Sequence, residues 1–308
     1  MNKILVFIDW FTPAYKAGGP IVSVSKIIEN LSFKFKFFVV TSNQDIDKRK
    51  VVSKEIENSW LLKEKYSIIY LSKDHQKTSF YKKILKNINP DVIYINSLFS
   101  TRFSIIPIIN LKNKKKIILA PRGMLGEGAL NIKRFKKNIF LRIIKKIKVY
   151  NKIIWQASTQ NEKLEIESIF GKSAKVVIAQ NFSSNTINIG YRTKKNNNDK
   201  LTILFISRIS KKKNLSFLID EINQCNNSYK IHLKIIGFQE DIDYCKICIN
   251  KLKKYNISYE LLGPIPHLNL SYHYIKSDIF CLPTHHENFG HVILEALSYG
   301  LPIIISNN

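Results

Sequence analysis

The residues best suited to chemistry lie near the end of the sequence, in PTHHENFGHVILEALSYGLPIIIS (Pro283–Ser306). Glu287 follows an apolar run, Gly290 opens a predicted helix whose N–H groups suit a phosphate or a sugar hydroxyl, and Glu295 lies on that helix. A carboxylate can accept hydrogen bonds from two hydroxyls of a ribose or another sugar. Burying two acids beside a cleft costs free energy unless a polyol hydrogen-bonds to them or a cation pairs with them. The pattern favours a polyol-binding site over a capped helix with one surface acid.

Two cations follow another apolar run, Leu201–Ile206, in the stretch SRISKKKN (Ser207–Asn214). If that run is a strand, Arg208 and Lys213 lie beyond its carboxyl end, where two cations facing a cleft can clamp a diphosphate. The alternative interpretation is a solvated loop in a lysine-rich protein.

A glycine pair occupies a similar place early in the chain. Gly18 and Gly19 follow the first predicted strand and precede a predicted helix at Ile21. Glycines there allow backbone N–H groups to approach a ligand near a helix N-terminus. The alternative is a plain tight turn into the helix.

The elements that must position these residues follow from the hydrophobic pattern. Continuous β-branched apolar runs alternate with longer amphipathic stretches, which is typical of a parallel sheet covered on both faces and favours a doubly wound α/β fold. The predicted strands are Ile4–Ile8, Phe37–Thr41, Ser67–Leu71, Val92–Ile95, Lys116–Ala120, Ile153–Ala157, Lys175–Ile178, Leu201–Ile206, Ile231–Ile236, Ser258–Leu262, Asp278–Leu282 and Pro302–Ser306. The predicted helices are Ile21–Leu31, Phe80–Asn87, Ser104–Leu111, Ile132–Val149, Asn161–Phe170, Asn214–Cys225, Asp241–Lys254, Leu268–Lys276 and His291–Tyr299.

The stretch TKKNNNDK (Thr193–Lys200) is polar and lacks apolar anchors, so it is the best candidate for a linker. We therefore predict two Rossmann-like domains, over residues 1–192 and 201–308, joined by a linker at 193–200. A ligand would lie in the cleft between them, at the carboxyl ends of the strands. Because the sequence stops at Asn308 directly after a predicted strand, we expect the second domain to be incomplete.

The stretch from Glu287 to Ala296 resembles the E-x7-E signature of retaining GT-B glycosyltransferases of family 4, also called glycosyl transferases group 1. The resemblance covers essentially the whole chain, and PRGML with the N-terminal glycines resembles a bacterial surface-polysaccharide subgroup. The other stretches that follow the family's order are FTPAYKAGGP (Phe11–Pro20), DVIYINSLFS (Asp91–Ser100), APRGMLGEGAL (Ala120–Leu130), ASTQNE (Ala157–Glu162), FISRISKKKN (Phe205–Asn214), KIIGFQED (Lys234–Asp241) and LLGPIPHLNLSYHYIKSDIFCLPT (Leu261–Thr284).

This resemblance implies transfer of a sugar from a nucleotide-diphosphate sugar to a glycan or lipid-linked acceptor, with retained configuration, in polysaccharide, lipopolysaccharide or capsule biosynthesis. Arg208 and Lys213 would hold the donor diphosphate and stabilise the leaving group as charge develops. Family members are thought to use same-face substitution assisted by the donor phosphate. The resemblance therefore implies no catalytic base, no cofactor and no metal.

The remaining roles are also carried over from the family. Glu287 would contact hydroxyls of the donor sugar, Asn288, Phe289 and Gly290 would add backbone contacts, and Glu295 would hold the ribose.

The resemblance also implies that the domain over 1–192 is the acceptor-side domain and that the domain over 201–308 is the nucleotide-sugar donor domain. Two further positions belong to the first predicted domain. Gly18 and Gly19 would lie against the donor phosphates. Asn96 stands where many relatives carry a His and would supply a polar contact. Relatives continue for several dozen residues past Asn308, so a truncated, catalytically inactive remnant is the alternative to an active enzyme.

The formal charge of +26 predicts attraction to anions. Of the 49 basic residues only 7 are Arg, and no nucleic-acid-binding module occurs, so we expect no nucleic-acid partner.

GT-B epimerases and phosphorylases share the two-domain shape, but the E-x7-E spacing and the lack of a pyridoxal-lysine motif weigh against them. Four Cys, no long apolar span and no signal-peptide pattern predict a cytoplasmic protein.

Short metal-like motifs are interpreted structurally. Asp45–Asp47 and Asp241–Asp243 each spell D-x-D, but the first falls in a loop and the second at a helix start, where Asp caps well. Cys245 and Cys248 lie on a predicted amphipathic helix without a partner pair, and His285–Glu287 are adjacent loop residues.

The stretch from Asn131 to Trp155 has nine Lys/Arg and no acid, with apolar residues near helical spacing. One interpretation is a domain helix with a solvated basic face. The other is a patch that rests on an anionic membrane, which would place the protein peripherally on the inner face of the plasma membrane.

Overall fold

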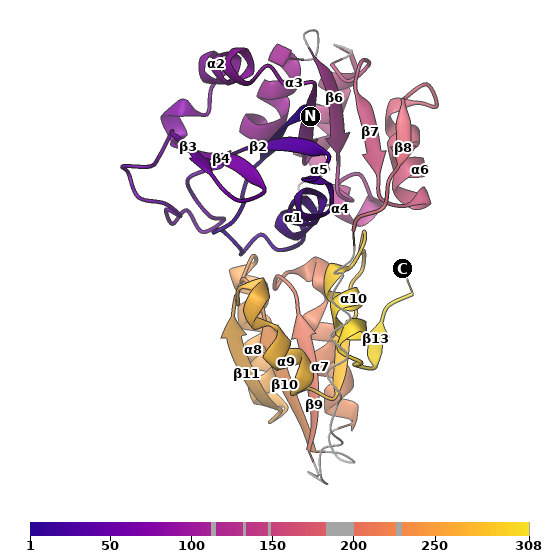
Figure 1. The fold of residues 1–308 in the computed structure, drawn as a ribbon. Helices are drawn as coiled ribbons and strands as arrows, with labels where there is room; N and C mark the ends of the chain where they lie inside the picture. Colours follow the sequence, from indigo (N-terminus) through magenta and orange to yellow (C-terminus); the bar gives the residue numbers. More distant parts are fainter. Residues whose placement is uncertain (112–114, 132–133, 147–148, 183–199, 226–229, 308) are drawn as a thin grey trace. The chain divides into compact units, whose positions relative to one another are not determined.

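The computed structural model describes residues 1–111, 115–131, 134–146, 149–182, 200–225 and 230–307. The chain divides into two compact units (Figure 1). The first unit contains Met1–Ala14 and Gly19–Phe182, and the second contains Tyr15–Gly18 and Ser183–Asn308. Each unit is built around its own sheet. The predicted linker at 193–200 lies outside the described residues except for Lys200, which begins a strand.

The first unit contains an eight-stranded sheet with the order β3-β4-β2-β1-β5-β6-β7-β8. All pairs are parallel except β3 with β4. The strands are β1 (Asn2–Ile8), β2 (Phe35–Ser42), β3 (Trp60–Leu62), β4 (Tyr66–Leu71), β5 (Val92–Asn96), β6 (Lys116–Ala120), β7 (Ile154–Ala157) and β8 (Val176–Ile178). The three-residue β3 was not predicted, because a strand that short carries no readable periodicity.

Helices cover both faces of this sheet, as its continuous apolar strands require (Figure 1). They are α1 (Gly19–Leu31), α2 (Thr78–Ile88), α3 (Ile106–Leu111), α4 (Glu127–Asn131), α5 (Arg134–Lys146) and α6 (Gln160–Phe170), with a 3-10 turn η1 (Lys73–His75) and a π-helical segment η2 (Thr101–Ile105). The helix predicted over 132–149 corresponds to α5, and its residues 132–133 and 147–148 lie outside the described residues.

The second unit contains a five-stranded parallel sheet with the order β11-β10-β9-β12-β13. Its strands are β9 (Lys200–Ile206), β10 (Lys230–Ile236), β11 (Ser258–Gly263), β12 (Ile279–Leu282) and β13 (Ile303–Ile305). Its helices are α7 (Leu215–Cys225), α8 (Ile242–Lys254), α9 (Ser271–Ile275) and α10 (His291–Ser298), with turns η3 (Lys211–Lys213) and η4 (His267–Asn269). The predicted doubly wound α/β fold class is confirmed for both units.

Both sheets have a topological switch point, where successive strands add on opposite sides of a central strand. In the first unit this point lies between β1 and β5, and in the second it lies between β9 and β12. Loops diverge there at the carboxyl ends of the strands and leave a crevice that binds ligands in open α/β sheets. The strand order therefore marks one candidate binding region in each unit.

The helices of the described ranges include none that is both long and apolar enough to cross a bilayer. Within the same ranges, no three His, Cys, Asp or Glu residues gather closely enough to hold a metal ion.

Gly237, directly after β10, permits a close approach of backbone to backbone. A Cβ at this position would lie 1.8 Å from the carbonyl oxygen of Ser207, and φ is +153°. Gly263 has φ +69° but open space where a Cβ would stand. A side chain at Gly237 would therefore clash with the backbone, whereas a side chain at Gly263 would only be strained by its backbone conformation.

We expect Gly237→Ala to destabilise the protein by roughly 3 kcal/mol, because the β10 loop must move away from Ser207. Gly263→Ala should cost only about 1 kcal/mol, since it meets strain but no clash. Urea unfolding of both variants measures the difference, and equal midpoints would contradict the assignment.

Candidate active site

The predicted site residues of the second unit gather at its switch point. Arg208 and Lys213 follow β9, and the loop that carries Glu287 follows β12. The loops are joined by the carbonyl oxygen of Lys212, which accepts hydrogen bonds from the Thr284 hydroxyl at 3.1 Å and from the His285 N–H at 2.9 Å. The two loops therefore form one fixed wall at the carboxyl edge of the sheet.

Lys213 and Glu287 form the central ion pair of this wall. The ammonium nitrogen lies 2.5 Å from Glu287 Oε2, and the two side chains are 11% and 24% exposed. Burial raises the pKa of Glu287, but the charge and hydrogen bond of Lys213, together with the Asn288 N–H and the charge of Lys212, leave the pKa below its ordinary value. Glu287 is therefore a carboxylate at neutral pH, and both oxygens are engaged, since Oε1 accepts from the Asn288 N–H at 3.2 Å.

Arg208 is paired in the same way with Glu240, which lies after β10. The guanidinium nitrogen is 2.5 Å from Glu240 Oε1, and both side chains are more than a third exposed. Such exposed pairs contribute about 0–1 kcal/mol, so an anionic ligand can replace the carboxylate at little cost. Glu240 was missed in the sequence because a single acid in a loop carries no signal of its own.

Lys212 adds a third cation that the motif analysis did not select. Burial, with the charge of neighbouring Lys213, lowers the pKa of Lys212 to about 8. Glu287, Glu240 and Arg208 also act on it, so all five charged groups belong to one cluster. Three cations against two carboxylates leave a net positive charge, which suits a diphosphate.

Gly290 turns the chain from this loop into α10. Its φ of +69° is left-handed, and a Cβ would lie 2.8 Å from Ile293 Cδ1, so glycine is favoured here. The turn places the start of α10 four residues after Glu287, beside the ion pair. The Phe289 ring packs against His291 at 4.8 Å between centroids. Helix N-termini of this kind favour anions and hydroxyl oxygens.

Glu295 is buried on α10, and both of its oxygens accept hydrogen bonds. His267 Nε2 lies 2.8 Å from Oε1, and the Tyr274 hydroxyl lies 2.9 Å from Oε2. Tyr274 is buried, whereas the His267 side chain is 42% exposed. Each carboxylate oxygen has a second lone pair, so Glu295 can still accept a hydroxyl. The distant partners His267 and Tyr274 were not found from the sequence.

Asn96 ends β5 in the first unit and holds an arginine. Its Oδ1 accepts from Arg122 Nε at 2.7 Å, and Arg122 also donates to the Tyr94 hydroxyl at 2.7 Å and to Asn181 Oδ1. Asn96 Nδ2 is buried and has no partner among the described residues. The position thus presents a fixed guanidinium and a buried N–H donor at the end of β5.

The two predicted glycines lie at the start of α1. Gly18 has φ +67° and donates its N–H to the carbonyl of Tyr15 at 3.1 Å, and Gly19 is the first residue of the helix. Gly19 and Asn96 belong to the first unit, and Gly18 belongs to the short segment Tyr15–Gly18 that is grouped with the second.

The metal-like motifs have structural roles. Asp241 caps α8 by accepting from the Tyr244 N–H at 3.0 Å, as predicted. Cys245 and Cys248 are buried in the core of the second unit, and burial raises the pKa of both thiols. Asp45 closes a tight loop through the Ile46 N–H and the Lys48 N–H.

Comparison with solved structures identifies the fold. Sucrose-phosphate synthase from Thermosynechococcus elongatus superposes with a TM-score of 0.76 at 16% identity, over 100% of this chain and 82% of that one. Anabaena HepE in complex with UDP and glucose superposes with a TM-score of 0.70 at 15% identity, over 100% and 81%. The chain has the GT-B fold. Residues 191–308 of this GT-B chain match the model of the family described as Glycosyl transferases group 1.

The curated relatives are longer than the part of them that aligns with this chain. A 41.2 kDa protein of the cps region of Klebsiella pneumoniae is 27% identical over 234 residues, which is 73% of this GT-B chain and 62% of that protein. The O-antigen biosynthesis glycosyltransferase WbnH of Escherichia coli is 26% identical over 172 residues, which is 56% of this chain and 46% of the enzyme. The chain therefore spans less than two thirds of the length of these relatives.

Lys212 yields a pH-dependent prediction. Its pKa of about 8 means that the ammonium loses its proton as the pH rises from about 7 to about 9, and a bound diphosphate then loses one charge partner. If a nucleoside diphosphate binds at this cluster, we expect its affinity, measured by calorimetry with UDP, GDP and ADP, to fall about fivefold over this range, corresponding to about 1 kcal/mol. Lys212→Arg stays charged and should abolish most of the fall.

Lys246→Arg is the matched control, since Lys246 is exposed on α8 of the same unit. An equal fall in the Lys212→Arg variant and the wild type would show that another group titrates.

Proposed function

We propose that this chain is a glycosyltransferase that moves a sugar from a nucleoside-diphosphate sugar to a glycan or lipid-linked acceptor, with retention of configuration, in polysaccharide biosynthesis. The observation that carries the proposal is the Lys213–Glu287 ion pair, 2.5 Å long, beside the N-terminus of α10 at the switch point of the second unit. Lys213 can pair with a leaving phosphate, and the adjacent Glu287 can accept hydrogen bonds from sugar hydroxyls.

The comparisons support the same chemistry. WbnH is named as an O-antigen biosynthesis glycosyltransferase, and the Klebsiella pneumoniae relative is described from the cps region. HepE is described in complex with UDP and glucose, and the pneumococcal O-GlcNAc transferase GtfA with UDP and GlcNAc. These properties belong to those proteins, and we extend the nucleotide-sugar donor to this chain because its charge cluster fits a diphosphate.

The reaction would proceed by exchange of partners at the cluster. The donor diphosphate takes Lys213 and Arg208, with Lys212 adding charge, and Glu287 is released to accept donor sugar hydroxyls. Asn288, Phe289 and Gly290 offer backbone contacts, as the resemblance implies.

Glycosyl transfer then breaks the bond between the anomeric carbon and the phosphate oxygen, and the electron pair stays on the phosphate. The acceptor hydroxyl oxygen forms the new bond on the same face of the sugar, and its proton passes to the departing phosphate. The cations stabilise the negative charge that develops on the leaving group. Glu295 holds the ribose and positions the donor, and neither glutamate acts as a base.

The first test compares UDP, GDP and ADP by calorimetry on the whole chain, followed by turnover measured as slow hydrolysis of the matching nucleotide sugar. We expect one nucleotide to bind. Lys213→Ala should lower turnover about 100-fold, because it removes a contact to the developing charge. Glu295→Ala should weaken nucleotide affinity about tenfold, since a buried acceptor for the ribose is lost.

Lys246→Ala, in which an exposed lysine of the same unit is removed, should leave both quantities unchanged. Full activity of Lys213→Ala and Glu295→Ala would contradict the site. Nucleotide binding without turnover in the wild type would favour the inactive remnant.

The exposed face of α5 supports membrane docking as a second part of the proposal. Phe135, Ile139 and Ile143 recur every four residues and are 78%, 41% and 54% exposed, whereas Leu141 and Ile144 are buried in the core. The flanking cations Arg134, Lys136, Arg142 and Lys145 are exposed. An apolar stripe between cations is typical of helices that lie in an anionic membrane surface. We therefore propose a peripheral position on the cytoplasmic leaflet.

Cosedimentation with vesicles that contain anionic phosphatidylglycerol tests this docking. We expect the triple variant Phe135→Ser, Ile139→Ser and Ile143→Ser to lose most of its binding, because the inserting stripe is removed. Lys136→Glu with Lys145→Glu should reduce binding at low salt by about thirtyfold or more, since two cations that each contribute about 1 kcal/mol are removed and replaced by negative charges.

Leu164→Ser, at a similarly exposed position on α6, is the matched control. Lys137 is unsuitable as a probe, because it donates to the Ala129 carbonyl and lies over the Phe99 ring. Equal binding of the triple variant and the control would refute docking through α5.

A further inference from the structure

Three elements of the second unit meet at the Glu295 carboxylate. Glu295 lies on α10, Tyr274 lies on α9, and His267 lies on η4, in the connection that follows β11. Oε1 accepts a hydrogen bond from His267 Nε2 at 2.8 Å, and Oε2 accepts one from the Tyr274 hydroxyl at 2.9 Å. The carboxylate is therefore held on both of its oxygens, by two side chains that come from two other elements.

Tyr274 is fixed by more than its hydrogen bond to Glu295. Its side chain is buried, and its ring stacks on that of Tyr299 with 5.1 Å between centroids and 9° between the ring planes. Tyr299 follows Glu295 by four residues at the end of α10, so the two side chains lie on the same face of the chain there. Burial and the charge of Glu295 raise the pKa of Tyr274 well above its ordinary value, so its hydroxyl keeps its proton and remains a donor.

His267 holds the other oxygen from the solvent side. Its side chain is 42% exposed, whereas that of Glu295 is 7% exposed. Pro266 restricts the backbone where the chain enters η4, and its carbonyl accepts from the Asn269 N–H at 2.9 Å. Because an ionised carboxylate only accepts hydrogen bonds, His267 Nε2 must carry the proton and donate it. His267 is therefore a donor at the exposed rim of a buried carboxylate.

The two glutamates of the site are held in different ways. Glu287 is paired with the ammonium group of Lys213, which the proposed donor diphosphate would take from it. Glu295 has neither a Lys nor an Arg partner within the described ranges, so a phosphate has no such cation to withdraw from it. The hydrogen bonds of Glu295 can therefore stay in place when a donor binds.

This anchoring leaves a defined pair of acceptors. Each carboxylate oxygen has two lone pairs, and His267 and Tyr274 take one on each oxygen. One lone pair on each oxygen remains for hydroxyls that lie side by side. The 2′- and 3′-hydroxyls of a ribose are such a pair, because they stand on adjacent carbons and on the same face of the ring. A carboxylate that is already held loses little freedom when it binds them, whereas a freely rotating one would lose more.

We propose that His267 and Tyr274 are positioning residues that hold Glu295 ready for both ribose hydroxyls and thereby make the site selective for ribonucleotides over deoxyribonucleotides. The inference rests on the proposed function, which gives the ribose to Glu295 but assigns no role to its two partners. In this role neither partner contacts the sugar that is transferred. Both act through the orientation of the carboxylate, so their loss changes discrimination between nucleotides rather than turnover.

Calorimetry on the whole chain tests this role with whichever of UDP, GDP and ADP binds best, and with its 2′-deoxy and 3′-deoxy analogues. We expect the wild type to bind each analogue about tenfold more weakly than the parent nucleotide, because each lacks one hydrogen bond to a carboxylate. Tyr274→Phe keeps the ring that stacks on Tyr299 and removes only the donor. It should reduce this preference to about threefold or less.

The 2′,3′-dideoxy analogue separates positioning from stability. It lacks both hydroxyls that would meet Glu295, so Tyr274→Phe should bind it as the wild type does. A variant that merely disturbed the fold would lose affinity for the parent nucleotide and for this analogue alike.

His267→Leu removes the other donor at a more exposed position, so it keeps the test decisive if Tyr274→Phe fails to fold. It should lower the preference for the parent nucleotide in the same way. His267→Gln offers an amide N–H in place of Nε2–H and should retain most of the preference.

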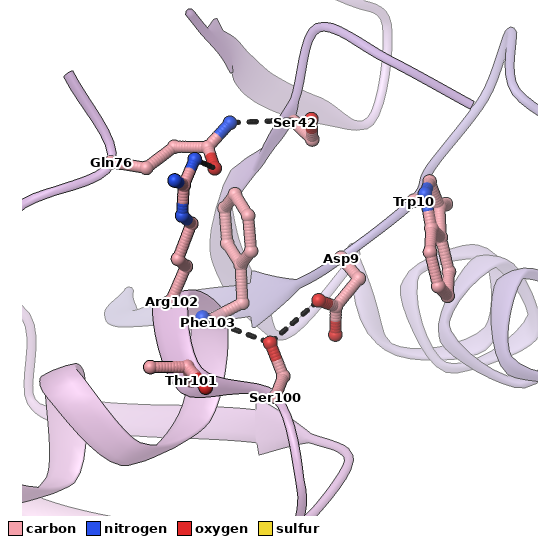
Figure 2. Close-up of a pocket in the computed structure, with 8 residues that line it drawn as sticks. All are labelled: Asp9, Trp10, Ser42, Gln76, Ser100, Thr101, Arg102 and Phe103. Atoms are coloured by element: carbon pink, nitrogen blue, oxygen red, sulfur yellow. Dashed lines mark hydrogen bonds between the residues drawn. The ribbon is translucent and has the colours of Figure 1, made fainter. Parts of the chain in front are cut away.

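The first unit supplies a matched control, because Asp9 there also accepts a hydrogen bond from a hydroxyl. Ser100 donates to Asp9 Oδ1 at 2.5 Å in a pocket at the switch point of that unit (Figure 2). Burial raises the pKa of Asp9 to about 6, although this hydrogen bond opposes the shift. Ser100→Ala removes a hydroxyl–carboxylate hydrogen bond of the same kind and should leave the preference for ribonucleotides unchanged.

The inference and the proposed function fail separately. Equal affinity of the wild type for the parent nucleotide and its deoxy analogues would overturn the inference and leave the proposed function standing. An undiminished preference in both Tyr274→Phe and His267→Leu would do the same. Failure of UDP, GDP and ADP alike to bind would instead contradict the proposed donor chemistry together with the inference.

Discussion

The arrangement of the second unit depends on the cost of keeping charges near a sheet edge. Lys213 and Glu287 are mostly removed from water, and either charge alone would be strongly destabilising there. Their pairing requires the loops after β9 and β12 to be held together, which the Lys212 carbonyl does through two hydrogen bonds. The hydrogen bonds that join the two loops therefore both stabilise this edge of the sheet and hold Lys213 next to Glu287.

Parallel topology explains why polar groups gather in two places. Every strand of a doubly wound sheet delivers its following loop to one edge, and the helices that cover the faces leave a gap only where the strand order reverses. Arg208 and Lys213 follow β9 and Glu287 follows β12, just as Asp9 follows β1 and Ser100 follows β5. Each unit thus concentrates its buried charges at its own switch point, although the chemistry of the two clusters differs.

The sequence was sufficient for the strands that are continuous apolar runs and for the loops that follow them. Lys213 and Glu287 could be placed at strand ends because runs such as Leu201–Ile206 are readable from their neighbours alone. Partners across the fold could not be found. Glu240 lies 32 residues from Arg208, and His267 lies 28 residues from Glu295, so the pairs depend on which strands become adjacent. Tyr274 lies 21 residues from Glu295 and was missed for the same reason.

The pairing of the cations also bears on selectivity. Lys213 and Arg208 are each neutralised by a carboxylate, so an anionic ligand must replace one ion pair with another and gains only the difference. A single phosphate offers little advantage over the carboxylate that it displaces. A diphosphate can engage Arg208 and Lys213 together, with the charge of Lys212 uncompensated nearby, and it frees Glu287 for hydroxyls that only a sugar-bearing ligand supplies. Internal pairing therefore favours a ligand that carries both a diphosphate and a sugar, which would distinguish the proposed donor from simpler phosphates.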